Sequence, residues 1–125
     1  MAGSFIEAQR MSVVSAEDGH CTMIMPVTSE QCNPYGMIHG GVLYSLADTA
    51  AGYAVYSLHQ ESLTVEGNVS YLRAGKNTDT IRAEASIIKD GARIVVVRAS
   101  VYDDSGKELI TARFTYYVLD KQKGS

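Results

Sequence analysis

The second half of the chain alternates between apolar and polar positions with a period of two. Apolar residues recur at every second position over 81–87, 94–101 and 109–118, and a similar pattern begins after residue 60. Successive side chains of a strand point to opposite faces, so each segment predicts a half-buried antiparallel strand. Polar and glycine-containing breaks at 74–77, 89–92 and 103–107 predict short hairpin turns and hence a four-stranded meander.

The first half of the chain predicts a short helix over 4–10 and two strands over 11–16 and 20–27, joined at the Asp-Gly pair 18–19. One capped helical turn follows at 28–31. A long helix over about 40–58 is apolar on nearly every side, which requires that protein surround it. The sequence therefore predicts an α+β fold in which an antiparallel sheet wraps around one long central helix.

Asp48 is the only side chain with a full charge between Glu30 and Glu61, and it lies in the middle of this apolar helix. Aspartate is a poor helix-interior residue, and a buried carboxylate is costly unless it is paired or hydrogen-bonded. No Lys or Arg stands three or four residues away to pair with it. A glycine-rich segment, 33–41, leads into the same helix, whose first amides lack intrahelical partners. This combination predicts a catalytic site for a carbonyl substrate.

The 125 residues are expected to form a single domain over 1–125, with a frayed tail at about 120–125. The net charge of −3 argues against nucleic acid as a partner. The chain has no apolar run long enough to span a membrane, and its first residues lack a signal-peptide pattern. We therefore expect a soluble, cytoplasmic protein.

The metal-binding residue types are too scattered to predict a metal site. Cys21 and Cys32 lack metal-type spacing, and the three histidines are far apart in the sequence. Free thiols are the favoured interpretation for the cysteines, with a disulfide between them as the alternative.

The string Asn33-x-x-Gly36-x-x-His39-Gly40-Gly41, followed by Leu46-Ala47-Asp48, resembles the hotdog-fold acyl-CoA thioesterases of the phenylacetate-degradation type. Residues 69–75 also resemble a strand-and-turn segment of that family, and the resemblance extends from about residue 11 to 118. One departure is Ala74, where the family usually has proline.

The resemblance implies hydrolysis of an acyl-CoA to the free acid and CoA, without a metal or organic cofactor. It implies that the Gly40 amide and the Asn33 side chain bind the thioester carbonyl oxygen. Asp48 becomes the nucleophile or the base that activates water, and Thr64 orients the acid or the water. His39 is expected to shape the loop, with direct proton transfer as the less favoured role. The resemblance also implies a homodimer with shared sites, assembled into a homotetramer.

The residues themselves support this chemistry. Unpaired amides at a helix start suit the oxyanion of a tetrahedral intermediate, and glycine permits close approach. Gly40 and Asp48 are eight residues apart, or roughly 12 Å along the helix, so both cannot reach one carbonyl. Two antiparallel copies of the helix would bring Gly40 of one chain near Asp48 of the other. A complete site therefore predicts a dimer.

Substrate contacts are predicted at Gly41 and Tyr35, and one or two basic residues are expected to bind the phosphates of CoA. The candidates are Arg73, Lys76, Lys89 and Arg93, for which a purely solvated role is the alternative. Tyr35, Met37 and three tyrosines in the helix are candidates to line a pocket for an aromatic or medium-chain acyl group. They are equally compatible with a core or an interface.

Two rival functions remain. A hotdog dehydratase or hydratase would act on an acyl-thioester, but those branches typically place a histidine and an acid in a different local motif. A non-catalytic acyl-CoA binding module would not need Asp48, and the chain has no DNA-binding segment that would accompany a regulator.

Overall fold

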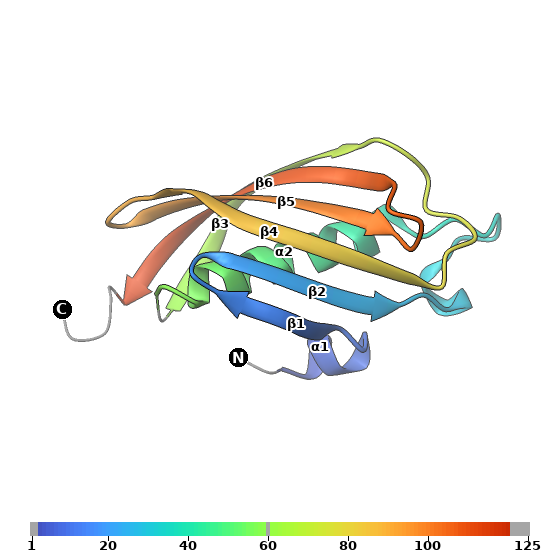
Figure 1. Cartoon of the computed structure of the whole chain (residues 1–125), viewed down its shortest axis with the longest axis horizontal. Coiled ribbons are helices and arrows are strands. Elements are labelled where there is room, and N and C mark those ends of the chain that lie inside the picture. Colours follow the sequence, from blue (N-terminus) through green and yellow to red (C-terminus); the bar gives the residue numbers. More distant parts are fainter. Residues whose placement is uncertain (1–2, 60, 121–125) are drawn as a thin grey trace.

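The computed structural model describes residues 3–59 and 61–120, which form one curved sheet around a central helix (Figure 1). The first elements are helix α1 (Ser4–Ala8), strands β1 (Ser12–Glu17) and β2 (His20–Pro26), and a 3₁₀ turn, η1 (Ser29–Gln31). The central helix α2 (Gly40–Tyr56) follows. The remaining strands are β3 (Glu61–Tyr71), β4 (Thr80–Asp90), β5 (Ile94–Asp103) and β6 (Glu108–Asp120).

Small side chains allow α2 to lie close against the sheet. Ala47, Ala50, Ala51 and Ala54 of the helix are fully buried. On the facing strands, the inward positions of the predicted alternation are buried as well, including Ile81, Ala83, Val95, Val97 and Phe114. The predicted α+β fold, with an antiparallel sheet around one long helix, is confirmed.

The predicted four-stranded meander is wrong at its first strand. The strand order is β1-β2-β4-β5-β6-β3, so β3 pairs with β6 and not with β4. The edge of β4 that β3 would need is occupied by β2, which pairs with it from His20↔Ser86 to Pro26↔Thr80. Residues 72–79 are therefore a crossover between two parts of the sheet and not a hairpin turn (Figure 1).

Two local predictions are confirmed, and the start of the predicted tail differs by one residue. Asp18 and Gly19 both have positive φ (54° and 79°), as the predicted two-residue turn requires. The predicted capped turn forms, and the Thr28 amide donates to Gln31 Oε1 at 2.7 Å. Strand β6 includes Asp120, the first residue of the predicted tail; residues 121–125 lie outside the described part of the chain.

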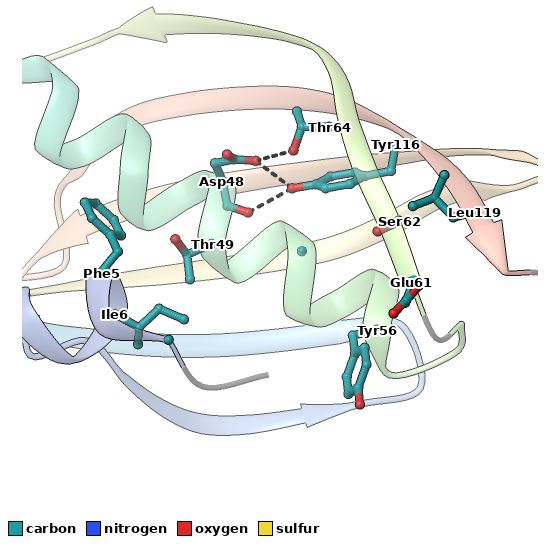
Figure 2. Close-up of a pocket in the computed structure, with 12 residues that line it drawn as sticks. Phe5, Ile6, Asp48, Thr49, Tyr56, Glu61, Ser62, Thr64, Tyr116 and Leu119 are labelled. Atoms are coloured by element: carbon teal, nitrogen blue, oxygen red, sulfur yellow. Dashed lines mark hydrogen bonds between the residues drawn. The ribbon is translucent and has the colours of Figure 1, made fainter.

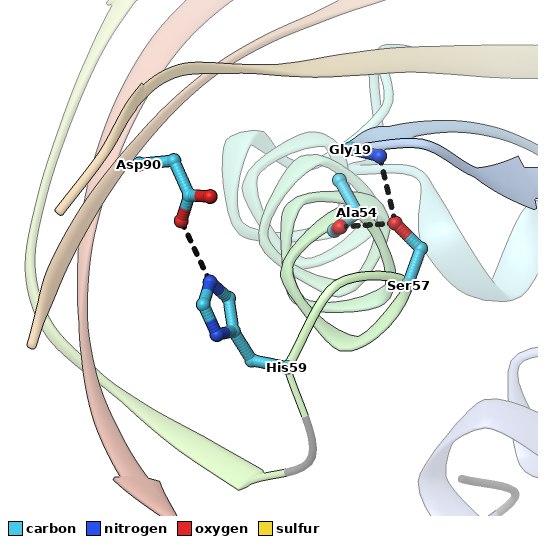
Figure 3. Close-up of polar contacts among 5 residues, drawn as sticks. All are labelled: Gly19, Ala54, Ser57, His59 and Asp90. Atoms are coloured by element: carbon cyan, nitrogen blue, oxygen red, sulfur yellow. Dashed lines mark hydrogen bonds and ion pairs between the residues drawn. The ribbon is translucent and has the colours of Figure 1, made fainter. Parts of the chain in front are cut away.

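Hydrogen bonds tie the carboxyl end of α2 to two hairpins (Figure 3). Ser57 Oγ donates to the carbonyl oxygen of Ala54 (2.7 Å) and accepts from the Gly19 amide between β1 and β2 (2.8 Å). His59 Nε2 lies 2.6 Å from Asp90 Oδ1 at the end of β4. The direction of α2 inside the sheet is thereby fixed at this end.

No helix within residues 3–59 and 61–120 combines the length and apolar character needed to cross a bilayer. In the same residues, no group of three or more His, Cys, Asp or Glu side chains is placed to hold a metal ion. Cys21 and Cys32 are both free thiols, as expected.

Candidate active site

Asp48 is half-buried on α2 and is held by two hydroxyl groups (Figure 2). Thr64 Oγ1 donates to Asp48 Oδ1 at 3.1 Å. The hydroxyl of Tyr116 donates to the same oxygen at 2.6 Å and also lies 2.8 Å from the main-chain oxygen of Asp48. The structure thus brings the predicted pair Asp48 and Thr64 together and adds Tyr116, which the sequence argument missed.

The pairing of β3 with β6 explains why two hydroxyls meet on one carboxylate. Thr64 lies directly opposite Tyr116 in the ladder, so both side chains point to the same face of the sheet. That face is the concave one, against which α2 packs. A register shift between Thr64 and Glu66 leaves Val65 without a paired residue, as in a β-bulge, and sets which β3 side chains face inward.

Burial raises the pKa of the Tyr116 phenol, and the neighbouring Asp48 charge raises it further. The side chain is only 3% exposed. The Tyr116 phenol is therefore protonated at neutral pH, and its hydroxyl is a hydrogen-bond donor. Its ring is tilted against Phe114, with the centroids 6.5 Å apart.

A cavity of about 820 Å³ borders Asp48, Thr64 and Tyr116. It lies between α1, α2 and the ends of β3 and β6 that are shown in Figure 2. Most of the larger side chains around it are apolar or aromatic: Phe5, Ile6, Tyr56 and Leu119. Of the tyrosines and the methionine predicted as pocket candidates, only Tyr56 is among its lining residues. The cavity offers apolar space directly beside a carboxylate.

The start of α2, away from the cavity beside Asp48, presents backbone amides that are free to donate hydrogen bonds. In the described part of the chain, the Gly40 and Gly41 amides have no hydrogen-bond acceptor. The Tyr71 hydroxyl donates to the carbonyl oxygen of Gly40 at 3.0 Å, and a Cβ on Gly40 would lie 2.9 Å from the Tyr71 ring. A side chain at position 40 would therefore displace the exposed ring of Tyr71.

Asn33 holds the loop that leads into α2. Its Oδ1 accepts from the amides of Tyr35 (2.9 Å) and Met37 (3.0 Å). Among the described residues nothing accepts from its Nδ2, which is left as a donor for a ligand. His39 is exposed and makes no side-chain cap, while its amide donates to the carbonyl of Gln31 at 2.9 Å.

A single chain does not assemble all the predicted catalytic residues. The cavity beside Asp48 is lined by none of Asn33, His39 and Gly40. Gly40 lines a second depression together with Arg73, and His39 and Gly41 line a third. The sequence prediction that Gly40 and Asp48 lie too far apart within one helix agrees with this separation.

The other predicted substrate contacts are also dispersed. Tyr35 is 79% exposed on the loop before α2. Lys76 lies in the crossover that follows Arg73, whereas Lys89 and Arg93 belong to the β4–β5 hairpin at the other end of β4. Within one chain, the four basic residues therefore do not form one phosphate site.

The sequence profile of the thioesterase superfamily matches residues 35–110. The chain belongs to the thioesterase superfamily. This match includes the start of α2, Asp48 and Thr64, which the structure and the sequence argument had singled out.

Named relatives and solved structures agree with this assignment. The chain is 31% identical over 116 residues to the 1,4-dihydroxy-2-naphthoyl-CoA hydrolase of Listeria monocytogenes, covering 90% of this chain and 94% of that protein. It is 29% identical over 107 residues to the acyl-coenzyme A thioesterase PaaI of Escherichia coli, covering 86% and 76%. The solved PaaI structure superposes with a TM-score of 0.91 at 26% identity, covering 96% and 87% of the two chains.

The crystal structure of a hypothetical thioesterase protein from Streptococcus pneumoniae with coenzyme A superposes with a TM-score of 0.87 at 28% identity, covering 94% and 93% of the two chains. The superfamily profile and the named hydrolases together show that this protein is a thioester hydrolase of the PaaI type with the hotdog fold.

Proposed function

We propose that this thioester hydrolase acts on an acyl-CoA, releasing the free acid and CoA, with Asp48 as nucleophile or general base. The observation that carries the proposal is the carboxylate of Asp48, which two neutral hydroxyls hold beside a mainly apolar cavity. The coenzyme A in the Streptococcus structure and the CoA thioesters named for two relatives support CoA as the leaving group.

In the proposed mechanism, the Gly40 amide and Asn33 Nδ2 donate to the thioester carbonyl oxygen. Their hydrogen bonds strengthen as negative charge develops on that oxygen in the tetrahedral intermediate. Asp48 either attacks the carbonyl carbon or removes a proton from an attacking water. When water attacks, the carbon–sulfur bond breaks and the acid is released directly. When Asp48 attacks, the same bond breaks to leave an acyl-aspartate anhydride, which one water then hydrolyses to the free acid and Asp48. In both routes the CoA thiolate leaves and takes a proton, and one water is consumed. Hydrolysis by either route uses no metal or organic cofactor.

The donors at the helix start and Asp48 are proposed to come from different chains of a homodimer. A distance of roughly 12 Å along the helix separates them within one chain. Strand β3 is at one end of the sheet and exposes Leu63 (54%) and Val65 (56%), an apolar edge that a second copy would cover. Two-fold symmetry would then form two composite sites. The homotetramer that the resemblance implies remains a prediction.

Arg73 is the first candidate to bind the CoA phosphates, because it lines the same depression as Gly40. Lys76, a few residues further along the crossover, is the second choice. Gly41 and Tyr35 keep their proposed substrate contacts at the helix start and its entry loop. The side chains of Phe5, Ile6, Tyr56 and Leu119 favour an aromatic or medium-chain acyl group over a charged one.

The test is release of free thiol from a panel of short, medium-chain and aryl acyl-CoAs, followed with a chromogenic thiol reagent. Wild-type protein is compared with Asp48→Asn, which carries the same cysteines and hence the same background labelling. Thiol release that depends on Asp48 supports the proposal. Hydration of an unsaturated acyl-CoA without thiol release would favour the hydratase alternative, and tight binding of CoA esters without turnover would favour the binding module.

A further inference from the structure

We infer that Tyr116 is a positioning residue for the hydrolysis: with Thr64 it holds Oδ1 of Asp48 and leaves Oδ2 as the reacting atom. This inference rests on the function proposed for Asp48. It assigns a role to a residue of β6, far along the chain from the motif around α2, and it distinguishes the two oxygens of the catalytic carboxylate.

The hydrogen bonds divide the carboxylate into two unlike oxygens (Figure 2). Oδ1 accepts from both Tyr116 (2.6 Å) and Thr64 (3.1 Å), whereas Oδ2 has no donor among residues 3–59 and 61–120. An oxygen that accepts two hydrogen bonds has less electron density available for attack or for taking a proton. Oδ2 is therefore the oxygen that remains free to meet a carbonyl carbon or a water.

The surroundings of Tyr116 suit it to a fixed and permanent donor. The ring is buried and packed on Phe114, so the hydroxyl cannot swing away from Asp48. The same hydroxyl lies 2.8 Å from the main-chain oxygen of Asp48, which limits rotation of the acid relative to its own helix. A phenol and an alcohol carry no charge, so they orient the carboxylate without forming an ion pair with it.

Thr64 and Tyr116 make unequal contributions. Thr64 is exposed and its bond to Oδ1 is 0.5 Å longer, from the two distances of 3.1 and 2.6 Å. A short bond to a charged acceptor is the stronger type, and a buried donor is exchanged less easily for water. Tyr116 is accordingly the main positioning group and Thr64 the minor one.

The decisive variant is Tyr116→Phe, which keeps the ring and removes only the hydroxyl. We expect kcat to fall by roughly ten- to a hundredfold, as for lost orientation of a reacting group, with KM changed by less than about threefold. Hydrogen bonds to a carboxylate favour its ionised form, so the acidic limb of the kcat profile should move to higher pH. A merely structural tyrosine would shift neither the limb nor the balance between kcat and KM.

Tyr117→Phe is the matched control. Tyr117 is the next residue of β6, so its side chain points away from the face that carries Tyr116, and in the sheet it pairs with Leu63 and Ile94. This variant also removes one phenolic hydroxyl from β6, but on the other face of the sheet, and it should leave kcat, KM and the pH profile unchanged. A second comparison uses Thr64→Val and the double variant. Because both hydroxyls bind one oxygen, the loss in the double variant should differ from the product of the two single losses.

If Tyr116→Phe does not fold, 3-fluorotyrosine at position 116 gives the same test. It keeps the hydroxyl and makes it a stronger donor, so the acidic limb should move to lower pH. An unchanged kcat and pH profile in folded Tyr116→Phe, or an unmoved limb with fluorotyrosine, would overturn the inference while thiol release by the wild type leaves the proposed function intact. If the wild type releases no thiol at all, the proposed function fails and this inference fails with it.

Discussion

Asp48 and Asp90 make similar contacts around α2 but differ in what surrounds them. Asp48 Oδ1 lies 2.6 Å from the hydroxyl oxygen of Tyr116, and Asp90 Oδ1 lies 2.6 Å from Nε2 of His59. Both partners carry a ring and are at most 9% exposed. Each acid has one carboxylate oxygen without a donor among the described residues, but only Asp48 borders the cavity of about 820 Å³; Asp90 lines neither this cavity nor the two depressions near the start of α2. A short hydrogen bond to a buried partner therefore does not by itself mark a reactive acid, and what distinguishes Asp48 is the cavity that it borders.

The partners of the two acids differ in charge. Asp48 is held by neutral hydroxyls, so its carboxylate charge is not cancelled. His59 forms an ion pair with Asp90 when it is protonated, and the pair connects the helix end to the β4–β5 hairpin (Figure 3). His59 Nδ1 is buried and has no partner among the described residues, which makes Asp90 the only hydrogen-bonding partner of this ring.

The largest effect should come from Asp48→Asn, which preserves shape and removes the charge. We expect kcat to fall by about a thousandfold or more, as for a nucleophile or general base, while substrate binding and the melting temperature change little. Steady-state thiol release, with binding and thermal unfolding measured on the same preparation, checks this. Retention of more than about a tenth of wild-type kcat would remove Asp48 from its assigned role.

The next effect tests whether the two ends of the site come from different chains. Asp48→Asn and Asn33→Ala should each be nearly inactive, because a lost oxyanion donor typically costs about a hundred- to a thousandfold. After the two are dissociated together and reassociated, about half of the dimers are mixed, and each mixed dimer has one site free of both changes. Roughly a quarter of all sites should then regain wild-type activity, from two-fold symmetry.

The control for this exchange is the same procedure on each variant alone, which should stay inactive. Mass spectrometry of differently tagged subunits shows that mixing has occurred. Baseline activity despite mixed dimers would mean that each site is built within one chain.

Asp90→Ala should lower the stability and leave kcat nearly unchanged, which is the reverse of what is expected for Asp48→Asn. Its removal leaves the buried His59 ring without a partner, which typically costs about 1–3 kcal/mol of stability. Below the unfolding transition, kcat should stay within about twofold of wild type, because Asp90 does not line the cavity. Urea unfolding and thiol release measure the two quantities. A large loss of kcat with unchanged stability would contradict the distinction between the two acids.

The smallest effect concerns Cys21, a buried thiol on β2. Burial, with a smaller contribution from Glu84, raises the pKa of this thiol from 9.0 to about 11. Between these values the unfolded chain loses the proton first, so the free energy of unfolding should fall as pH rises from about 9 to 11. Cys21→Ala should flatten this part of the stability curve, as measured by urea unfolding at several pH values; an unchanged slope would argue against the shift.

The sequence was informative wherever the pattern of neighbouring residues determines the local structure. Alternation along β4, β5 and β6 showed which residues share a face, and the apolar character of α2 showed that a sheet must surround it. The isolation of Asp48 in that helix identified the candidate acid without any knowledge of its neighbours. Tyr116 had a detectable signal as well, since it falls on the inward face of β6, where a buried hydroxyl needs a partner.

Only the tertiary structure decided how β3 enters the site. Strict alternation groups Leu63 and Val65 with the inward-facing Gly67 and Val69, which would direct Thr64 away from Asp48. The register shift between Thr64 and Glu66 reverses this, so Leu63 and Val65 are exposed and Thr64 faces the acid. A period of two specifies which residues share a face but neither which strands are neighbours nor where a ladder slips. Those depend on pairing between distant segments, and here β2 occupies the edge of β4 and leaves β3 to pair with β6.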